Sequence, residues 1–199
     1  MYEPNSFKEN IKRPEKGKKV CFLPEDYVVI DLETTGLNPE KDEIIEIGAV
    51  RVRRLMITDT FSTLVYPQKG IDPFITRLTG ITPEMVSDAP CIREVLSSLM
   101  NFVKSDVVIG HNVHFDINFL YDKTVECFGH GFSNNFVDTM QLSRELFPEY
   151  EHHKLCNLEE RFCLQNAQAH RALSDVIVTN DAYQYMRKWI IEKGVHWHD

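Results

Sequence analysis

The short loop NPEKDE, at residues 38–43, constrains the fold of this chain more than any other sequence feature. It separates two runs rich in β-branched residues, VVIDLETTGL at 28–37 and IIEIGAVRV at 44–52. A loop this short allows only a hairpin-like return, because parallel strands need a crossover of about a dozen residues. The two runs are therefore predicted to be antiparallel neighbours, and TFSTLVY at 60–66 is predicted to follow as a third strand.

Beyond the third strand, the pattern changes to helices that alternate with short strands. Pro73, Gly80 and Pro83 interrupt residues 71–86, which indicates short helical turns around a loop. The elements predicted next are a helix from Cys91 to Val103, a strand at 106–112, a helix at 114–129, a strand at 135–138, and helices at 140–146 and about 172–191. This alternation implies parallel crossovers. The predicted fold class is α/β, with a five-stranded mixed β-sheet (a three-stranded antiparallel meander plus two parallel crossover strands) flanked by α-helices.

Two acidic residues, Asp31 and Glu33, lie two positions apart in the first strand. Residues i and i+2 of a strand share one face, so both carboxylates point away from the apolar Ile30 and Leu32. Like charges this close are unfavourable unless a cation lies between them, and carboxylate oxygens suit Mg²⁺ or Mn²⁺ rather than Zn²⁺. The alternative for this pair alone is a strand end whose acids point into solvent.

Further candidate ligands occur at two later points in the chain. In GHNVHFD, Asp116 is predicted one or two residues into a helix, with Asn112 in the preceding loop or capping that helix. In HRALSD, His170 and Asp175 can reach one site only if His170 lies in the loop before the last helix, because five residues turn a helix by about 140°. Taken singly, Asp116 is an ordinary helix-end acid and His170 an ordinary cap or surface residue.

Considered together, these residues predict a catalytic site. Four carboxylates can hold two divalent metal ions about 4 Å apart, which bind the attacking and leaving oxygens of a phosphoryl displacement. The carboxylates are those of Asp31, Glu33, Asp116 and Asp175. A base must take a proton from the attacking water, and His170 is the candidate that spacing ties to the cluster, because a histidine side chain ordinarily titrates close to neutral pH.

Length and composition favour a single domain, because the chain has 199 residues of which 43% are hydrophobic. The predicted organisation is a mobile basic N-terminal arm at 1–25 and one domain at 26–199. Residues 1–19 carry six basic and three acidic side chains, although the net charge of the whole chain is −8. The arm is interpreted either as a solubilising tail or as a nucleic-acid contact. No apolar run is long enough for a membrane span, so we expect a cytoplasmic protein without a membrane partner.

The motifs resemble those of the DEDDh 3′-5′ exonucleases. This DnaQ-like superfamily includes the proofreading ε subunit of DNA polymerase III and the exonuclease domain of PolC-type polymerases. The resemblance covers about residues 26–192 and rests on VVIDLETTGL, VIGHNVHFD and HRALSD in the expected order, with RLTGIT and VDTMQLSRELFP between them. It implies an RNase H-like fold and makes residues 26–199 an exonuclease domain.

The resemblance also implies roles for individual residues. Those that match the family's metal ligands are Asp31, Glu33, Asp116 and Asp175, and His170 matches the general base. For the terminal nucleotide, the family pattern implies a pocket lined by Thr34, through its backbone, and by Leu37, which packs against a base. Thr79 and Asn112 are expected near the same pocket.

The implied activity is two-metal-ion hydrolysis that removes nucleotides from the 3′ end of DNA. The implied substrate is a single strand or a frayed end, as in proofreading or repair, with a DNA polymerase as the partner. Two alternatives remain open. A 3′-5′ exoribonuclease that trims RNA would look similar at these motifs, because contacts to the 2′-OH are not readable from them. A non-catalytic nucleic-acid-binding accessory module would use the acids only for structure and would hydrolyse nothing.

Overall fold

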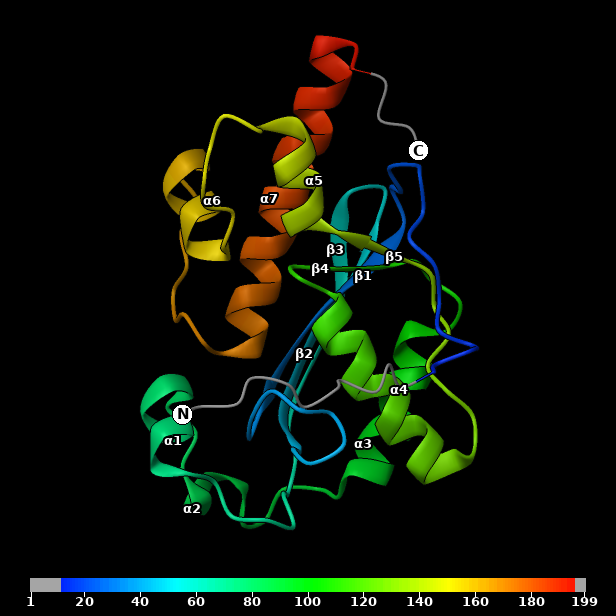
Figure 1. The fold of residues 1–199 in the computed structure, drawn as a ribbon, viewed down its shortest axis with the longest axis vertical. Coiled ribbons are helices and arrows are strands. Elements are labelled where there is room, and N and C mark those ends of the chain that lie inside the picture. Colours follow the sequence, from blue (N-terminus) through cyan, green and yellow to red (C-terminus); the bar gives the residue numbers. More distant parts are fainter. Residues whose placement is uncertain (1–11, 196–199) are drawn as a thin grey trace, which may run out of the picture.

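Residues 12–195 are described by a computed structural model, in which they form one sheet flanked by helices (Figure 1). The strands are β1 Tyr27–Thr34, β2 Ile44–Arg53, β3 Met56–Leu64, β4 Val108–Gly110 and β5 Phe136–Asp138. They lie in the order β3-β2-β1-β4-β5. The first three strands are antiparallel neighbours, whereas β4 is parallel to both β1 and β5. The predicted five-stranded mixed sheet is therefore confirmed.

The helices of the described residues cover both faces of this sheet. They are α1 Pro73–Thr79, α2 Pro83–Val86, α3 Ile92–Val103, α4 His114–Phe128, α5 Thr139–Leu146, α6 Leu155–Phe162 and α7 Ala172–Lys193. Ile30 and Leu32 of β1 are buried with residues of α3 and α4. Val29, on the other face, is buried with residues of α5, α6 and α7. Because Asp31 and Glu33 follow Val29 at steps of two, they face α7.

Two elements differ from the prediction. The third strand begins at Met56 rather than at residue 60, because Arg54 and Leu55, with φ of 50° and 64°, form a tight turn directly after β2. Such two-residue turns normally carry Asn or Gly, so no sequence signal marked this one. The sequence also predicts no helix at 155–162, where the structure has α6. This helix has only eight residues, and Lys154 before it is not a usual capping residue.

The N-terminal segment contacts the domain, although residues 1–25 were predicted to form a separate mobile arm. Lys19 forms a parallel β-bridge with Phe136 of β5, and Val20 is only 9% exposed. The Arg13 guanidinium lies 2.5 Å from the Asp122 carboxylate of α4. Residues 18–20 therefore pair with the outer edge of β5, whereas residues 1–11 of the predicted arm lie outside the described residues.

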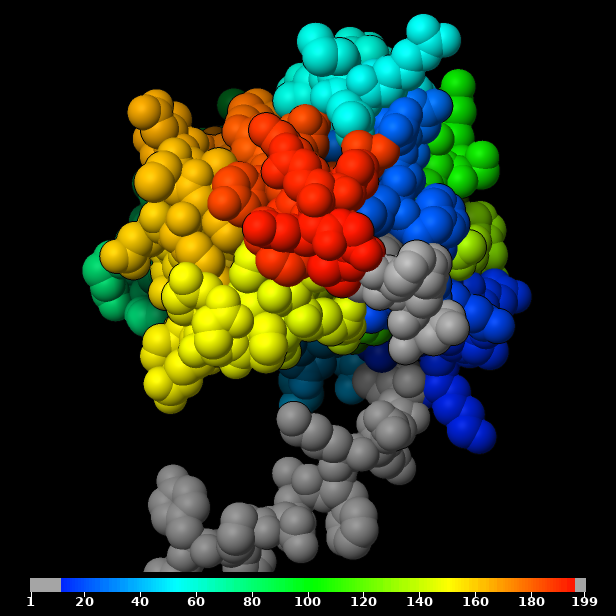
Figure 2. All heavy atoms as spheres, turned by 90° about the horizontal axis from the view of Figure 1, so that it is seen from above, coloured from blue at the N-terminus to red at the C-terminus, as the bar shows by residue number. Residues whose placement is uncertain are grey.

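The C-terminal half of α7 lies beside the turn between β2 and β3 and beside the segment that precedes β1 (Figure 2). The Tyr183 hydroxyl donates to the Pro24 carbonyl at 2.8 Å, and the Gln184 amide donates to the Leu55 carbonyl at 3.0 Å. These contacts fix the middle of α7, two to three turns after Asp175. Within residues 12–195, no helix has the length and apolar character that crossing a membrane requires.

Candidate metal centre and adjoining pocket

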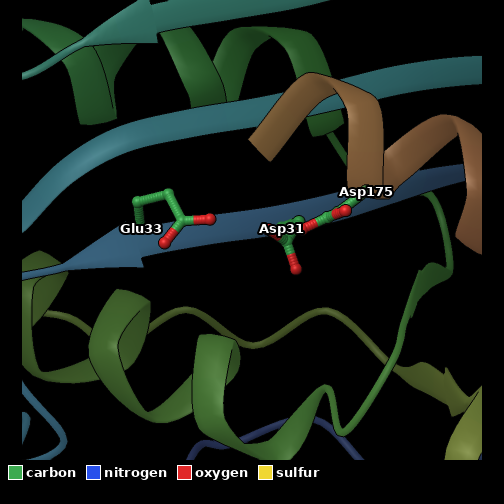
Figure 3. Close-up of side chains that lie close together, drawn as sticks. All are labelled: Asp31, Glu33 and Asp175. Atoms are coloured by element: carbon green, nitrogen blue, oxygen red, sulfur yellow. The ribbon is translucent and has the colours of Figure 1, made fainter. Parts of the chain in front are cut away.

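Three carboxylates converge where β1 meets the first turn of α7. Asp31 and Glu33 project from β1, and Asp175 reaches towards them from α7 (Figure 3). One oxygen from each residue lies within 4.8 Å of the corresponding oxygens of the other two. The alternation of β1 places the first two acids on the face that α7 covers, so α7 brings the third acid to them.

The loop before α7 orients Asp175. One carboxylate oxygen accepts a hydrogen bond from the Asn166 side-chain amide at 2.8 Å, and the other accepts from the backbone N–H of His170 at 3.1 Å. His170 has φ of 60°, a left-handed conformation that turns the chain sharply into the helix. The predicted position of His170, in the loop directly before the last helix, is confirmed.

Asp116 lies beside this group without joining it. It is the third residue of α4 and only 3% exposed, and one of its oxygens accepts a hydrogen bond from the backbone N–H of Leu32 at 3.1 Å. Its negative charge is close enough to raise the pKa of Asp31. The structure thus brings three of the four predicted ligands together and places the fourth next to β1, bonded to the strand itself.

The pKa values of all four acids are raised, and burial is the largest cause in each case. Burial and the neighbouring carboxylates hold the pKa of Asp31 well above its usual range. Burial, Asp175 and Glu46 raise the pKa of Glu33 to about 8. The pKa values of Asp116 and Asp175 are also raised, mainly by burial. A carboxylate cluster that holds protons so strongly would gain from a divalent cation, and an all-oxygen donor set suits Mg²⁺ or Mn²⁺.

A further buried carboxylate, Glu46, belongs to the same region and escaped the sequence analysis. It lies opposite Glu33 on the neighbouring strand β2, is 3% exposed, and forms an ion pair with Arg171 at 2.7 Å. A sequence signal for it existed, because Glu46 is the one acid within the apolar run IIEIGAV. Nothing in the spacing, however, linked it to Arg171, which is 125 residues away.

An open pocket of about 630 Å³ adjoins the carboxylates, and Glu33 forms part of its wall. Its other lining comes from the end of β1, the loop after it, α1 and Phe115. Thr34, Leu37 and Thr79, predicted as substrate-binding residues, all line it, and Leu37 is 85% exposed. A pocket with apolar walls beside a cluster of acids can hold the base of a nucleotide while the phosphate of that nucleotide meets a cation.

Asn112 does not line this pocket and does not cap α4. The residue before the first turn of α4 is Val113, and Asn112 lies in the preceding loop with φ of 60°. Its backbone N–H donates to the Asp138 carboxylate at 3.1 Å. Asn tolerates left-handed backbone better than most residues, which explains its place in this loop. Of the two positions predicted for Asn112, in the loop or capping the helix, the structure confirms the loop.

Comparison with known proteins identifies relatives over most of the chain. The exonuclease family RNase_T matches residues 28–183. The chain is 41% identical over 162 residues to DNA polymerase III subunit epsilon of Aquifex aeolicus, which covers 81% of this chain and 80% of that protein. It is also 41% identical over 179 residues to the PolC-type DNA polymerase III of Caldanaerobacter subterraneus subsp. tengcongensis. That match covers 90% of this chain but only 13% of the much longer polymerase.

Solved structures of other proteins share the fold of this chain. Exonuclease X, in complex with 5′ overhanging duplex DNA, is 26% identical and superposes with a TM-score of 0.65 over 84% of this chain and 93% of that one. Escherichia coli Exonuclease I, in complex with a dT13 oligonucleotide, is 18% identical with a TM-score of 0.74, over 86% of this chain and 43% of that one. The second likeness concerns the fold alone. Together they confirm the predicted RNase H-like arrangement of the sheet and helices.

Proposed function

The chain belongs to the exonuclease family, and on this premise we propose that it removes nucleotides from the 3′ end of DNA by metal-dependent hydrolysis. The observation that carries the proposal is the convergence of Asp31, Glu33 and Asp175 beside a pocket of about 630 Å³. Three carboxylates this close together would bind a divalent cation, and the pocket is large enough for a terminal nucleoside. The cofactors would be two divalent metal ions, Mg²⁺ or Mn²⁺, which stabilise the charge on the attacking and leaving oxygens.

The chain's own residues would share the remaining tasks. The proposed metal ligands are Asp31, Glu33, Asp116 and Asp175, of which Asp116 would turn its carboxylate from the Leu32 N–H towards the cations. His170 would take the proton from the attacking water, because it lies directly before α7 and next to Asp175 in space. Thr34, Leu37 and Thr79 would bind the last nucleotide, and Asn112 would only support the loop beside α4.

Two observations support DNA as the substrate and a polymerase as the partner. A relative with 26% identity was solved on 5′ overhanging duplex DNA, and relatives with 41% identity are named as DNA polymerase III proteins. We therefore propose a role in proofreading, in which a mismatched 3′ end frays and enters the pocket as a single strand. The PolC-type relatives are far longer than this chain, so the polymerase would be either a separate subunit or a further part of the same protein.

A degradation assay tests this function. Oligonucleotides labelled at the 5′ end would be offered as single-stranded DNA, as duplexes with matched or mismatched 3′ ends, and as RNA, each with Mg²⁺ or Mn²⁺. The expected result is a ladder of products shortened one nucleotide at a time, formed faster from single strands and mismatched ends. Faster cleavage of RNA would replace DNA as the substrate, and no hydrolysis with either ion would contradict the enzymatic function.

Substitution of a ligand provides the matched control for this assay. Asp31→Ala removes one oxygen donor from the cluster, and we expect turnover at saturating Mg²⁺ to fall by at least ~10²-fold with the fold intact. Asp59→Ala removes an exposed acid of β3 that pairs with Arg51, and turnover should stay near the wild-type rate. Equal rates for Asp31→Ala and the wild type would exclude Asp31 from the metal site.

A further inference from the structure

Glu46 is a buried acid that none of the proposed chemical steps uses. It is the third residue of β2, is 3% exposed, and is the β-sheet partner of Glu33 on β1. A buried carboxylate is unfavourable unless it is paired and hydrogen-bonded. Its surroundings must therefore supply a positive charge and several hydrogen-bond donors. Both come from the residues at the start of α7.

Glu46 receives four hydrogen bonds from two consecutive residues. The Arg171 guanidinium donates from Nε to both carboxylate oxygens, at 3.2 and 3.1 Å, and from Nη2 to Oε1 at 2.7 Å. The backbone N–H of Ala172 donates to Oε2 at 3.0 Å. Arg171 stands at the cap position of α7 but makes no side-chain cap hydrogen bond there. Glu46 thus satisfies the first free N–H of α7 from a neighbouring strand, as a cap residue would.

These bonds act on the two segments that carry the site. His170 immediately precedes Arg171, and Asp175 lies one helical turn after it, with its N–H bonded to the Arg171 carbonyl at 3.1 Å. On the other side, Glu46 is in register with Glu33. The ion pair therefore connects the strand next to β1 with the turn that holds His170 and Asp175.

We propose that Glu46 and Arg171 are positioning residues, which hold the first turn of α7 so that Asp175 and His170 face the acids of β1. This proposal rests on the proposed metal site, since it concerns the geometry of that site. Neither residue is a ligand or takes part in a chemical step. Loss of residues that orient metal ligands typically weakens metal binding or activity by ~10–100-fold, and we expect effects of this size.

The substitution Arg171→Gln separates positioning from charge, because the two effects have opposite signs. Removal of the positive charge leaves Glu46 as an additional negative charge near Glu33, which by itself would tighten the binding of a cation. Loss of positioning would weaken it. We therefore expect Mn²⁺ binding, measured by isothermal titration calorimetry without substrate, to weaken by ~10–100-fold in Arg171→Gln. Binding as tight as wild type, or tighter, would overturn the proposal.

Arg171→Lys and Arg53→Gln are the matched variants. Lysine keeps the charge but lacks the planar fork that donates to both oxygens, so Arg171→Lys should also weaken Mn²⁺ binding. Full wild-type binding by Arg171→Lys would mean that charge alone matters and would overturn the positioning role. Arg53→Gln removes the arginine at the far end of β2, which pairs with Asp106 between α3 and β4, and it should bind Mn²⁺ as the wild type does.

Kinetic constants and melting temperatures exclude a purely structural role. A positioning loss should lower kcat by ~10–100-fold and leave KM for a single-stranded oligonucleotide within about twofold, because the pocket lies on β1 and α1. A structural loss would lower the melting temperature and leave kcat per folded molecule unchanged, which would contradict the proposal. If Arg171→Gln does not fold, Arg171→Lys takes its place in each measurement, because it keeps the positive charge and a loss of Mn²⁺ binding then reports positioning alone. Absence of nuclease activity in the wild type would count against the proposed function only, since Mn²⁺ binding tests the positioning independently.

Discussion

Carboxylates that converge in a partly buried site keep their protons to higher pH than exposed carboxylates do. Glu33 shows the effect most clearly, because burial, Asp175 and Glu46 raise its pKa from 4.5 to about 8. Between these two pH values, the folded protein without a cation holds a proton that the unfolded chain releases. The unfolded state therefore binds fewer protons, and stability must decrease as the pH rises through this range.

The first prediction follows from this sign. Without divalent ions, the melting temperature should fall as the pH is raised from 4.5 to about 8, and Mn²⁺ should reverse most of the loss, because the cation binds only the folded cluster. Calorimetry at several pH values, with and without Mn²⁺, measures both effects. Glu33→Gln is the control and should flatten the metal-free dependence. An identical slope in this variant would exclude Glu33 as its source.

His170 supports a second prediction at this scale. His170→Asn removes the imidazole, tolerates the left-handed φ of 60°, and retains the backbone N–H that bonds to Asp175. If His170 is the base, kcat should fall by ~10²–10⁴-fold and the acid limb of the pH–rate profile should shift or disappear. Mn²⁺ affinity should remain, since the carboxylates are unchanged. An unaltered kcat and acid limb would falsify the assignment of the base.

The packing of α7 on β2 is the critical contact between elements. Gly48 of β2 lies so close to the start of α7 that a β-carbon at this position would be 2.4 Å from the backbone carbon of Ala172. Real β-carbons do not approach backbone atoms so closely, and backbone on both sides cannot move aside cheaply. Glycine at this position therefore allows the helix to bring Asp175 down to the two acids of β1.

A third prediction concerns this contact. Gly48→Ala should push the first turn of α7 away from the sheet, at a cost of about 1–3 kcal/mol in the free energy of unfolding, and weaken Mn²⁺ binding at the same time. Thermal melting and calorimetric titration measure the two effects. Gly70→Ala is the control, because a β-carbon at residue 70 meets no atom within 4 Å. If Gly48→Ala bound Mn²⁺ as tightly as the wild type, the close packing at Gly48 would not be needed to position Asp175.

The whole molecule includes the segment before β1, which extends the sheet beyond β5. Gly17 approaches the backbone of Asn134 so closely that a β-carbon would be 1.9 Å from its carbonyl oxygen. Lys16 donates to the Asn118 side chain at 2.6 Å, and burial lowers the pKa of Lys16. The segment therefore packs tightly against α4, the helix that carries Asp116.

Truncation gives the fourth prediction. A chain that starts at residue 21 loses the β-bridge to Phe136 and the buried Val20, and should be about 2 kcal/mol less stable than a chain that starts at residue 12. This corresponds to a fall of ~4–8 °C in melting temperature. Equal melting temperatures for the two chains would contradict this prediction.

The same two chains also test whether the basic arm contacts nucleic acid. If it does, the chain that starts at residue 21 should have a higher KM, and its KM should depend less on salt concentration.

The sequence by itself determined what depends on local geometry. Strand periodicity placed Asp31 and Glu33 on one face, the short loop after β1 required an antiparallel return, and alternation of strands and helices required parallel crossovers. Helical geometry also required His170 to precede α7. These rules act over a few residues, so they hold before the chain has packed.

Only the tertiary structure decided which distant groups meet. It brought Asp175 to the acids of β1 while bonding Asp116 to the Leu32 N–H, and it paired Glu46 with Arg171 across 125 residues. It also added the N-terminal segment to the sheet edge, where composition had suggested a mobile arm. No sequence spacing encodes such contacts, because they depend on how whole helices and strands pack once their apolar faces are buried.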